Sequence, residues 1–169
     1  MQLPLVTRGS ASSVLFAAAL AALLAACGGP TPPPPPTVVN ATFTAAKDVN
    51  ADAGGTGAPI AVRVYQLASA TAFQASTFFP LYEKDTATLK DDLVKREDLL
   101  LAPGQSRTLT LTPDDRVHAI GVFAGYRDYE HVAWNRSVDL PAHETSKLTL
   151  TAGRGGLELA IEPAKVPGS

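Results

Sequence analysis

One reactive side chain in this 169-residue sequence stands at a position that limits the roles it can have. Cys27 is the only cysteine, and residues 28–169 contain no other. A single thiol cannot form a disulfide within the chain, and it excludes a zinc site built on paired cysteines. The cysteine directly follows an apolar stretch and precedes a run of prolines. This placement indicates a role at the N-terminal end of the protein and none in its core.

Residue patterns that support catalysis are missing from the sequence. It contains no G-x-S-x-G elbow, no H-E-x-x-H pair and no glycine loop of the phosphate-binding kind. His118, His131 and His143 are scattered, and none has a second histidine at ligand spacing. Asp91-Asp92 and Asp114-Asp115 are adjacent pairs, whereas carboxylates that act as acid and base converge across a cleft. We therefore expect no enzyme activity, no metal and no cofactor.

Net charge excludes one class of partner. The formal charge is −2, and Arg8 is the only charged residue before Cys27. The part of the chain from Cys27 onward therefore carries about −3, which offers no basic surface for nucleic acid. We expect no nucleic-acid partner and no small-molecule substrate.

The first 26 residues have the layout of a secretory signal. One positive charge, at Arg8, precedes an uncharged run of 14 residues, 13–26, that ends in small side chains. A run of this length is too short to cross a bilayer, which takes about 20 residues. Residues 1–26 are therefore predicted to be a signal peptide that is removed.

The residues Leu24-Ala25-Ala26-Cys27 are similar to the bacterial lipobox. In proteins with that motif the signal is cleaved before the cysteine, which is then acylated. We expect a covalent lipid on Cys27, because several acyl chains together hold a protein firmly at a membrane. The alternative is an ordinary signal cleaved after Ala26 that leaves a free thiol. Gly28, where sorted lipoproteins of the inner membrane have aspartate, indicates the periplasmic face of the outer membrane.

A proline-rich segment follows the cysteine. Residues 28–37 read GGPTPPPPPT, and consecutive prolines favour an extended polyproline II arm that spans about 30 Å at ~3.1 Å per residue. Residues 27–37 are thus predicted to form a lipidated tether. A ligand for a proline-binding domain is the alternative.

Short alternating segments dominate the rest of the chain and predict a β-sandwich over residues 38–162. In residues 38–45 and 59–67, apolar and polar side chains alternate, which is typical of half-buried strands. Further strands are expected at 97–103, 106–112, 117–126, 134–140, 146–151 and 156–162. Brief turns join them, for example at Pro103-Gly104. Eight such strands indicate two antiparallel sheets packed face to face, followed by a flexible tail at 163–169.

Residues 70–95 predict a small helical insertion. Residues 71–74, TAFQ, fit a capping box at the start of a helix that would end before Pro80. Thr88-Leu89-Lys90-Asp91 would start a second short helix, with Leu89 and Leu93 on one face. Helices this short need a sheet to pack against. Arg127-Asp128 are interpreted as a local ion pair, with a binding role as the alternative, and Trp134 as a core anchor.

Several of these segments together resemble one family, the TssJ outer-membrane lipoproteins of the type VI secretion system. The matching features are the lipobox, a glycine-bearing loop at 50–57, the strand PIAVRVYQL at 59–67, the block around Phe73, Phe78, Phe79 and Leu81, Pro103-Gly104, and IGVFAGYRD at 120–128 followed by Trp134. The family usually has arginine directly after this tryptophan, whereas here Asn135 intervenes before Arg136.

This resemblance implies a transthyretin-like sandwich and a scaffold role. It implies that the lipoprotein binds the periplasmic C-terminal region of TssM, in a complex that also contains TssL. The family's partner-binding loop lies between the first two strands. Carried over to this chain, the partner-binding residues are Asn50, Ala51, Asp52, Ala53, Gly54, Gly55, Thr56 and Gly57.

Two other functional classes remain open from the residues alone. A ligand- or glycan-binding lipoprotein would need a concave pocket lined with aromatic side chains, and the chain has one tryptophan. An envelope hydrolase would need the nucleophile or metal set that the sequence lacks.

Overall fold

The computed structural model describes residues 32–164. The predicted signal, Cys27 and the start of the proline-rich arm lie outside this range, as do residues 165–169. Residues 32–37 belong to neither a helix nor a strand. Residues 35–164 belong to one compact unit, Pro35–Ser169.

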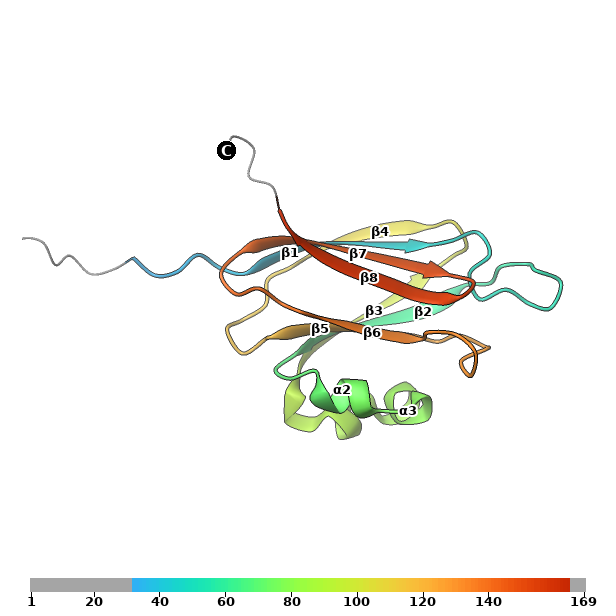
Figure 1. Ribbon diagram of the computed structural model, residues 1–169, viewed down its shortest axis with the longest axis horizontal. Coiled ribbons are helices and arrows are strands. Elements are labelled where there is room, and N and C mark those ends of the chain that lie inside the picture. Colours follow the sequence, from blue (N-terminus) through green and yellow to red (C-terminus); the bar gives the residue numbers. More distant parts are fainter. Residues whose placement is uncertain (1–31, 165–169) are drawn as a thin grey trace, which may run out of the picture. The chain divides into compact units, whose positions relative to one another are not determined.

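All eight predicted strands are present, and they form two four-stranded sheets (Figure 1). The first sheet has the order β4-β1-β7-β8, and the second has the order β3-β2-β5-β6. The strand bounds are β1 Val38–Ala45, β2 Ile60–Leu67, β3 Leu93–Leu101, β4 Ser106–Leu111, β5 Ala119–Ala124, β6 Asn135–Asp139, β7 Thr145–Gly153 and β8 Gly156–Pro163. The predicted two-sheet sandwich is confirmed, but one strand pair differs from the expected antiparallel arrangement. Neighbouring strands are antiparallel except β1 and β7, which pair in parallel.

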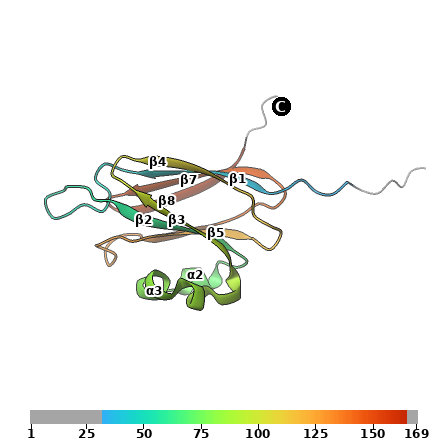
Figure 2. The ribbon, with the colours of Figure 1, turned by 180° about the vertical axis from the view of Figure 1, so that it is seen from behind.

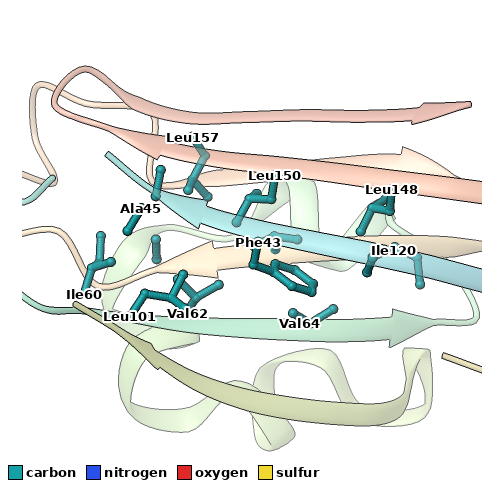
Figure 3. Close-up of a cluster of buried hydrophobic side chains, with 14 of the residues drawn as sticks. Phe43, Ala45, Ile60, Val62, Val64, Leu101, Ile120, Leu148, Leu150 and Leu157 are labelled. Atoms are coloured by element: carbon teal, nitrogen blue, oxygen red, sulfur yellow. The ribbon is translucent and has the colours of Figure 1, made fainter. Parts of the chain in front are cut away.

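The main core lies between the two sheets (Figure 3). It contains the apolar residues that alternate with polar ones along the strands. In β1 the alternate residues Val39, Ala41, Phe43 and Ala45 are all buried. Leu148 and Leu150 of β7 face the same core because they are the register partners of Ala41 and Phe43. Burial of a large apolar side chain contributes about 1.5–3 kcal/mol.

A second core lies on the outer face of the β3-β2-β5-β6 sheet. Helices α2 (Thr71–Ala75) and α3 (Phe78–Leu89), with the short 3-10 helix η2 (Lys90–Asp92), form a third layer there (Figures 1 and 2). Tyr65 and Leu67 of β2 belong to this second core and are buried beneath the helical layer, whereas Val62 and Val64 belong to the main core. An added Cβ at Gly121 of β5 would lie 2.9 Å from Leu67 Cδ1 and 3.2 Å from the Phe73 ring. Glycine at this position therefore lets the helical layer approach the sheet.

The helix bounds differ from the sequence prediction at both helices. The predicted capping box is wrong: α2 has no side-chain cap, and Ala70 occupies the N-cap position. The Thr71 N–H instead bonds the Ser69 hydroxyl at 3.2 Å. Pro80 does not end a helix but lies in the first turn of α3. Proline is tolerated there because the first-turn N–H groups have no partner within the helix.

The C-terminal end of the helical insertion also differs from the predicted residue 95. Leu89 closes α3, and Leu93 begins β3 four residues earlier than predicted. Leucine spacing of i, i+4 suits a helix face, but the residues from Leu93 onward pair in register with β2. Long-range sheet pairing therefore overrides the local helical pattern. At the other end of the sandwich domain, Pro163 belongs to β8 and not to the predicted tail.

One buried carboxylate fastens the helical layer to the sheet. Asp85 of α3 accepts hydrogen bonds from the Tyr65 hydroxyl at 2.9 Å and from Arg96 Nη1 at 2.9 and 3.1 Å. Arg63 lies on the same carboxylate at 3.4 Å and also donates to the Leu81 carbonyl. Burial alone would raise the pKa of Asp85, but the hydrogen bonds from Arg96, Tyr65 and the Thr86 backbone outweigh it and lower that pKa.

The strand directions give the sandwich two distinct ends (Figure 1). The arm end is where residues 35–37 lead into β1, beside the connections 112–118 and 140–144. Here the His143 N–H donates to Thr37 Oγ1 at 2.8 Å, and its ring Nδ1 lies 3.1 Å from the Pro35 carbonyl. The loop end is where β1 finishes, and it carries the connections 46–59, 102–105, 125–134 and 154–155. An eight-residue strand such as β1 separates the ends by about 26 Å.

A polar hollow at the loop end of the sandwich

Three connections of the loop end surround a hollow of about 340 Å³. They are the β1–β2 loop (residues 46–59), the β5–β6 loop (residues 125–134) and the β7–β8 turn. The lining is mostly polar and consists of Asn50, Ala51, Asp52, Ala53, Tyr126, Asp128, Val132 and Arg154. The loop predicted to bind a partner therefore borders the hollow. In the other two connections, the sequence suggests a binding role only for Arg127-Asp128, and only as the alternative to an ion pair. That both connections border the hollow follows from the strand order.

The base of the β1–β2 loop is fixed to the sandwich. The Val49 side chain is fully buried in the main core, and its carbonyl accepts the Ala58 N–H at 3.0 Å. Asn50 is also buried, and both polar atoms of its amide are used within the chain. Its Nδ2 donates to the Pro59 carbonyl at 3.2 Å, and its Oδ1 accepts the Arg127 N–H at 2.9 Å. Asn50 thus positions the loop and ties it to the β5–β6 loop.

The tip of the loop is closed by its own hydrogen bonds. Asp52 donates its N–H to the Thr56 carbonyl at 3.0 Å and accepts the Gly55 N–H on its carbonyl at 3.0 Å. Its carboxylate accepts the Thr56 N–H at 2.9 Å. Gly55 has φ +83°, a conformation that glycine adopts without cost. Residues 52–56 are exposed yet internally bonded, so the loop presents an ordered surface.

Gly57 fixes where the loop returns to the sandwich. A Cβ at this position would lie 2.2 Å from the Lys47 carbonyl oxygen and 3.3 Å from Pro103 Cβ. Backbone atoms cannot move aside as a side chain can. The segment of the loop that leads back into β2 therefore requires glycine at residue 57.

The charges around the hollow are of both signs. Asp128 and Arg154 line it together with Asp52. Asp128 Oδ1 lies 2.5 Å from His131 Nδ1, and this hydrogen bond raises the pKa of His131. The Arg127–Asp128 ion pair predicted from the sequence is wrong, because Asp128 pairs with His131 instead. The backbone N–H of Arg127 supports Asn50, a contribution that no side-chain pattern reveals.

Tyr126 and Trp134 hold the two ends of the β5–β6 loop. The buried Tyr126 hydroxyl donates to the Gly153 carbonyl at 2.9 Å, and burial raises the pKa of Tyr126. Trp134 packs against both cores and meets the Phe78 and Phe123 rings edge-on, at centroid distances of 5.3 and 5.6 Å. The prediction that Trp134 is a core anchor is confirmed. Arg136, two residues on, is exposed and donates to the Asn135 carbonyl.

Within residues 32–164, no three histidine, cysteine or acidic side chains are grouped so that they could hold a metal ion. The longest helix in the same range, α3, has 12 residues, and none there is long and apolar enough to cross a bilayer.

Comparison with known proteins places this architecture in a family. The family model described as "Type VI secretion lipoprotein, VasD, EvfM, TssJ" matches residues 37–155. The crystal structure of the type VI lipoprotein TssJ1 from Pseudomonas aeruginosa is 35% identical, with a TM-score of 0.74, and the match covers 78% of this chain and 100% of that one. The Serratia marcescens protein Lip, a membrane-bound component of the type VI secretion system, is 28% identical with a TM-score of 0.67; 73% of this chain and 96% of that chain are covered.

A more distant likeness concerns the fold alone. A chain in a structure described as the TssM C-terminal domain from EAEC is 21% identical with a TM-score of 0.58, over 73% of this chain and 97% of that one. No curated protein matches the chain.

These matches identify the class first: this is a structural lipoprotein of a secretion system, built as a β-sandwich with a helical layer. More specifically, the chain belongs to the type VI secretion lipoprotein family that includes TssJ.

Proposed function

We propose that this chain is a non-catalytic scaffold of the type VI secretion membrane complex, held by a lipid on Cys27 at the periplasmic face of the outer membrane. Its loop end binds the periplasmic C-terminal region of TssM, in a complex that also contains TssL. The observation that carries this proposal is the placement of the partner loop. Residues 50–57 lie at the opposite end of β1 from the arm that leads to Cys27.

The opposite ends suit a tethered scaffold. The proposed tether joins the sandwich through residues 35–37 at the arm end, so the loop end is not the point of attachment. Tethering raises the local concentration of the loop end near a periplasmic partner.

The order within the β1–β2 loop supports recognition of a protein partner. Asn50 and Asp52 hold the loop in one shape before binding, so less conformational entropy is lost when a partner binds. The backbone groups of Ala53 and Gly54 and the Thr56 hydroxyl take no part in the hydrogen bonds of the loop and are exposed, so they remain available for hydrogen bonds across an interface. The mixed charges of Asp128 and Arg154 beside them offer further polar contacts.

Two substitutions test the proposal. Gly57→Ala places a methyl group against the Lys47 carbonyl and distorts the loop. Thr112→Ala, the control, shortens an exposed side chain in a connection of the arm end. The full-length lipoprotein, extracted in detergent, is titrated with the periplasmic C-terminal region of its cognate TssM. We expect the wild type and Thr112→Ala to bind alike and Gly57→Ala to bind at least about tenfold more weakly.

The thermal midpoint of each variant shows whether the fold is intact. A wild-type lipoprotein that forms no complex at micromolar protein contradicts the proposed function. Equal binding by Gly57→Ala and the wild type contradicts the assignment of the site to the β1–β2 loop.

A further inference from the structure

The helical layer exposes aromatic side chains beside the loop end. Phe79 and Tyr82 of α3 are 50% and 47% exposed, and they are two of the three large hydrophobic residues exposed in the described chain. Tyr129 of the β5–β6 loop is half-buried next to them. Its ring meets Phe79 edge-on at 5.3 Å and stacks on Phe78 at 4.4 Å. We call Phe79, Tyr82 and Tyr129 the aromatic patch.

The patch is held rigidly from below. Tyr82 stacks on the buried Phe78 ring at 5.6 Å, and the Arg63 guanidinium lies 5.8 Å from the centre of the Tyr82 ring. Arg63 is itself fixed by hydrogen bonds to the carbonyls of Leu81 and Tyr82. Rings that are held in place lose little side-chain entropy when a partner covers them.

A groove lies beside Phe79 of the patch, at a kink in α3. Lys84 has the non-helical angles φ −142° and ψ 38°. The Thr88 hydroxyl lies 3.0 Å from the Pro80 carbonyl and 2.9 Å from the Lys84 carbonyl, and so supports the irregular turn. The groove of about 280 Å³ is lined by Phe79, Pro80, Glu83, Lys84, Ala87 and Thr88. It is large enough for one apolar side chain of a partner.

The β5–β6 loop contributes residues both to the aromatic patch and to the hollow at the loop end. Tyr129, within the patch, directly follows Asp128, and Asp128 and Val132 line the hollow with residues 50–53. One short loop therefore borders both surfaces. The β1–β2 loop itself offers only small or polar side chains at residues 50–57. The residues that carry most of the energy of protein interfaces are enriched in tryptophan, tyrosine and arginine, and residues 50–57 include none of these.

We propose that the aromatic patch is the apolar half of the TssM-binding surface, with the β1–β2 loop as its polar half. This inference rests on the proposed function. The partner inserts an apolar side chain beside Phe79 in the α3 groove and covers Tyr82, while the loop end contacts the same partner through polar groups. Exposed apolar surface on a monomeric protein commonly marks such an interaction site.

Single substitutions in the full-length lipoprotein test this surface by titration with the periplasmic C-terminal region of TssM. Phe79→Ser and Tyr82→Ser should each weaken binding at least about tenfold. Tyr82→Phe keeps the ring and should bind as the wild type does. The matched control is Leu100→Ser, which removes the third exposed apolar side chain from the edge strand β3. This control should change the affinity less than about twofold.

The outcomes separate the two proposals. If Phe79→Ser and Tyr82→Ser bind like the wild type while Gly57→Ala binds weakly, the proposed function holds and the aromatic patch is not part of the interface. If the wild type does not bind TssM, both proposals fall. Sedimentation of the lipoprotein alone tests a second copy as the occupant. Self-association that is lost in Phe79→Ser, with unchanged affinity for TssM, overturns the inference.

Discussion

Cys27→Ser is expected to release the protein from the membrane into the soluble periplasmic fraction. Serine has no thiol to acylate, and each buried methylene of an acyl chain contributes about 0.8 kcal/mol to membrane binding. Fractionation of cells that express the variant, followed by immunoblotting, measures the change.

The β-sandwich itself should be unaffected by this substitution, because the compact unit begins at Pro35. The purified variant should therefore keep the wild-type thermal midpoint and its affinity for TssM. A Cys27→Ser protein that stays in the membrane fraction and supports secretion would contradict the tether.

Asp85→Ala is expected to destabilise the fold by about 2–3 kcal/mol. The carboxylate is buried, so its loss leaves the buried Tyr65 hydroxyl without its acceptor. Arg96 and Arg63 then keep only the exposed carboxylate of Asp98 as an ion-pair partner. The figure is at the low end for a buried pair because both arginines are partly exposed to solvent. Guanidinium denaturation followed by fluorescence of the single tryptophan, Trp134, measures the loss. Asp114→Ala breaks an exposed ion pair with Arg116 and should change nothing measurable.

Acid should remove the same contribution in the wild type. The pKa of Asp85 is lowered in the folded protein, so its contribution is complete above the unfolded value of about 4 and is lost as pH falls through the folded pKa. The difference in stability between the wild type and Asp85→Ala should therefore shrink below about pH 4. A difference that is constant down to pH 2 would show that the ion pairs do not fasten the helical layer.

How much the sequence predicts depends on the range of the interaction involved. The alternation in residues 38–45 is a local signal, and β1 has those bounds. The second buried face of β2, with Tyr65 and Leu67, follows from the cover supplied by α3 and so has no local signal. The parallel pairing of Val38 with Thr145 joins segments that are far apart in the sequence and carry no mutual signal.

The helical insertion shows how a local rule fails. TAFQ satisfies the capping-box pattern, but Ser69 supplies the hydrogen bond at the start of α2. Pro80 was interpreted as a helix end, and proline is equally acceptable in a first turn. The sequence likewise predicts only part of the candidate site. The resemblance identified residues 50–57, whereas the hollow they border and the role of Asn50 depend on contacts with the β5–β6 loop.

Site-specific photo-cross-linking in cells tests the central claim most directly. Thr56 at the tip of the β1–β2 loop and Thr112 in a connection of the arm end are both exposed. Each is replaced in turn by p-benzoylphenylalanine in the full-length lipoprotein, and adducts are identified by mass spectrometry. We expect a covalent adduct with TssM from position 56 and none from position 112. An adduct from position 112 alone, or none from position 56 when both proteins are present, would contradict the claim that the loop end binds TssM.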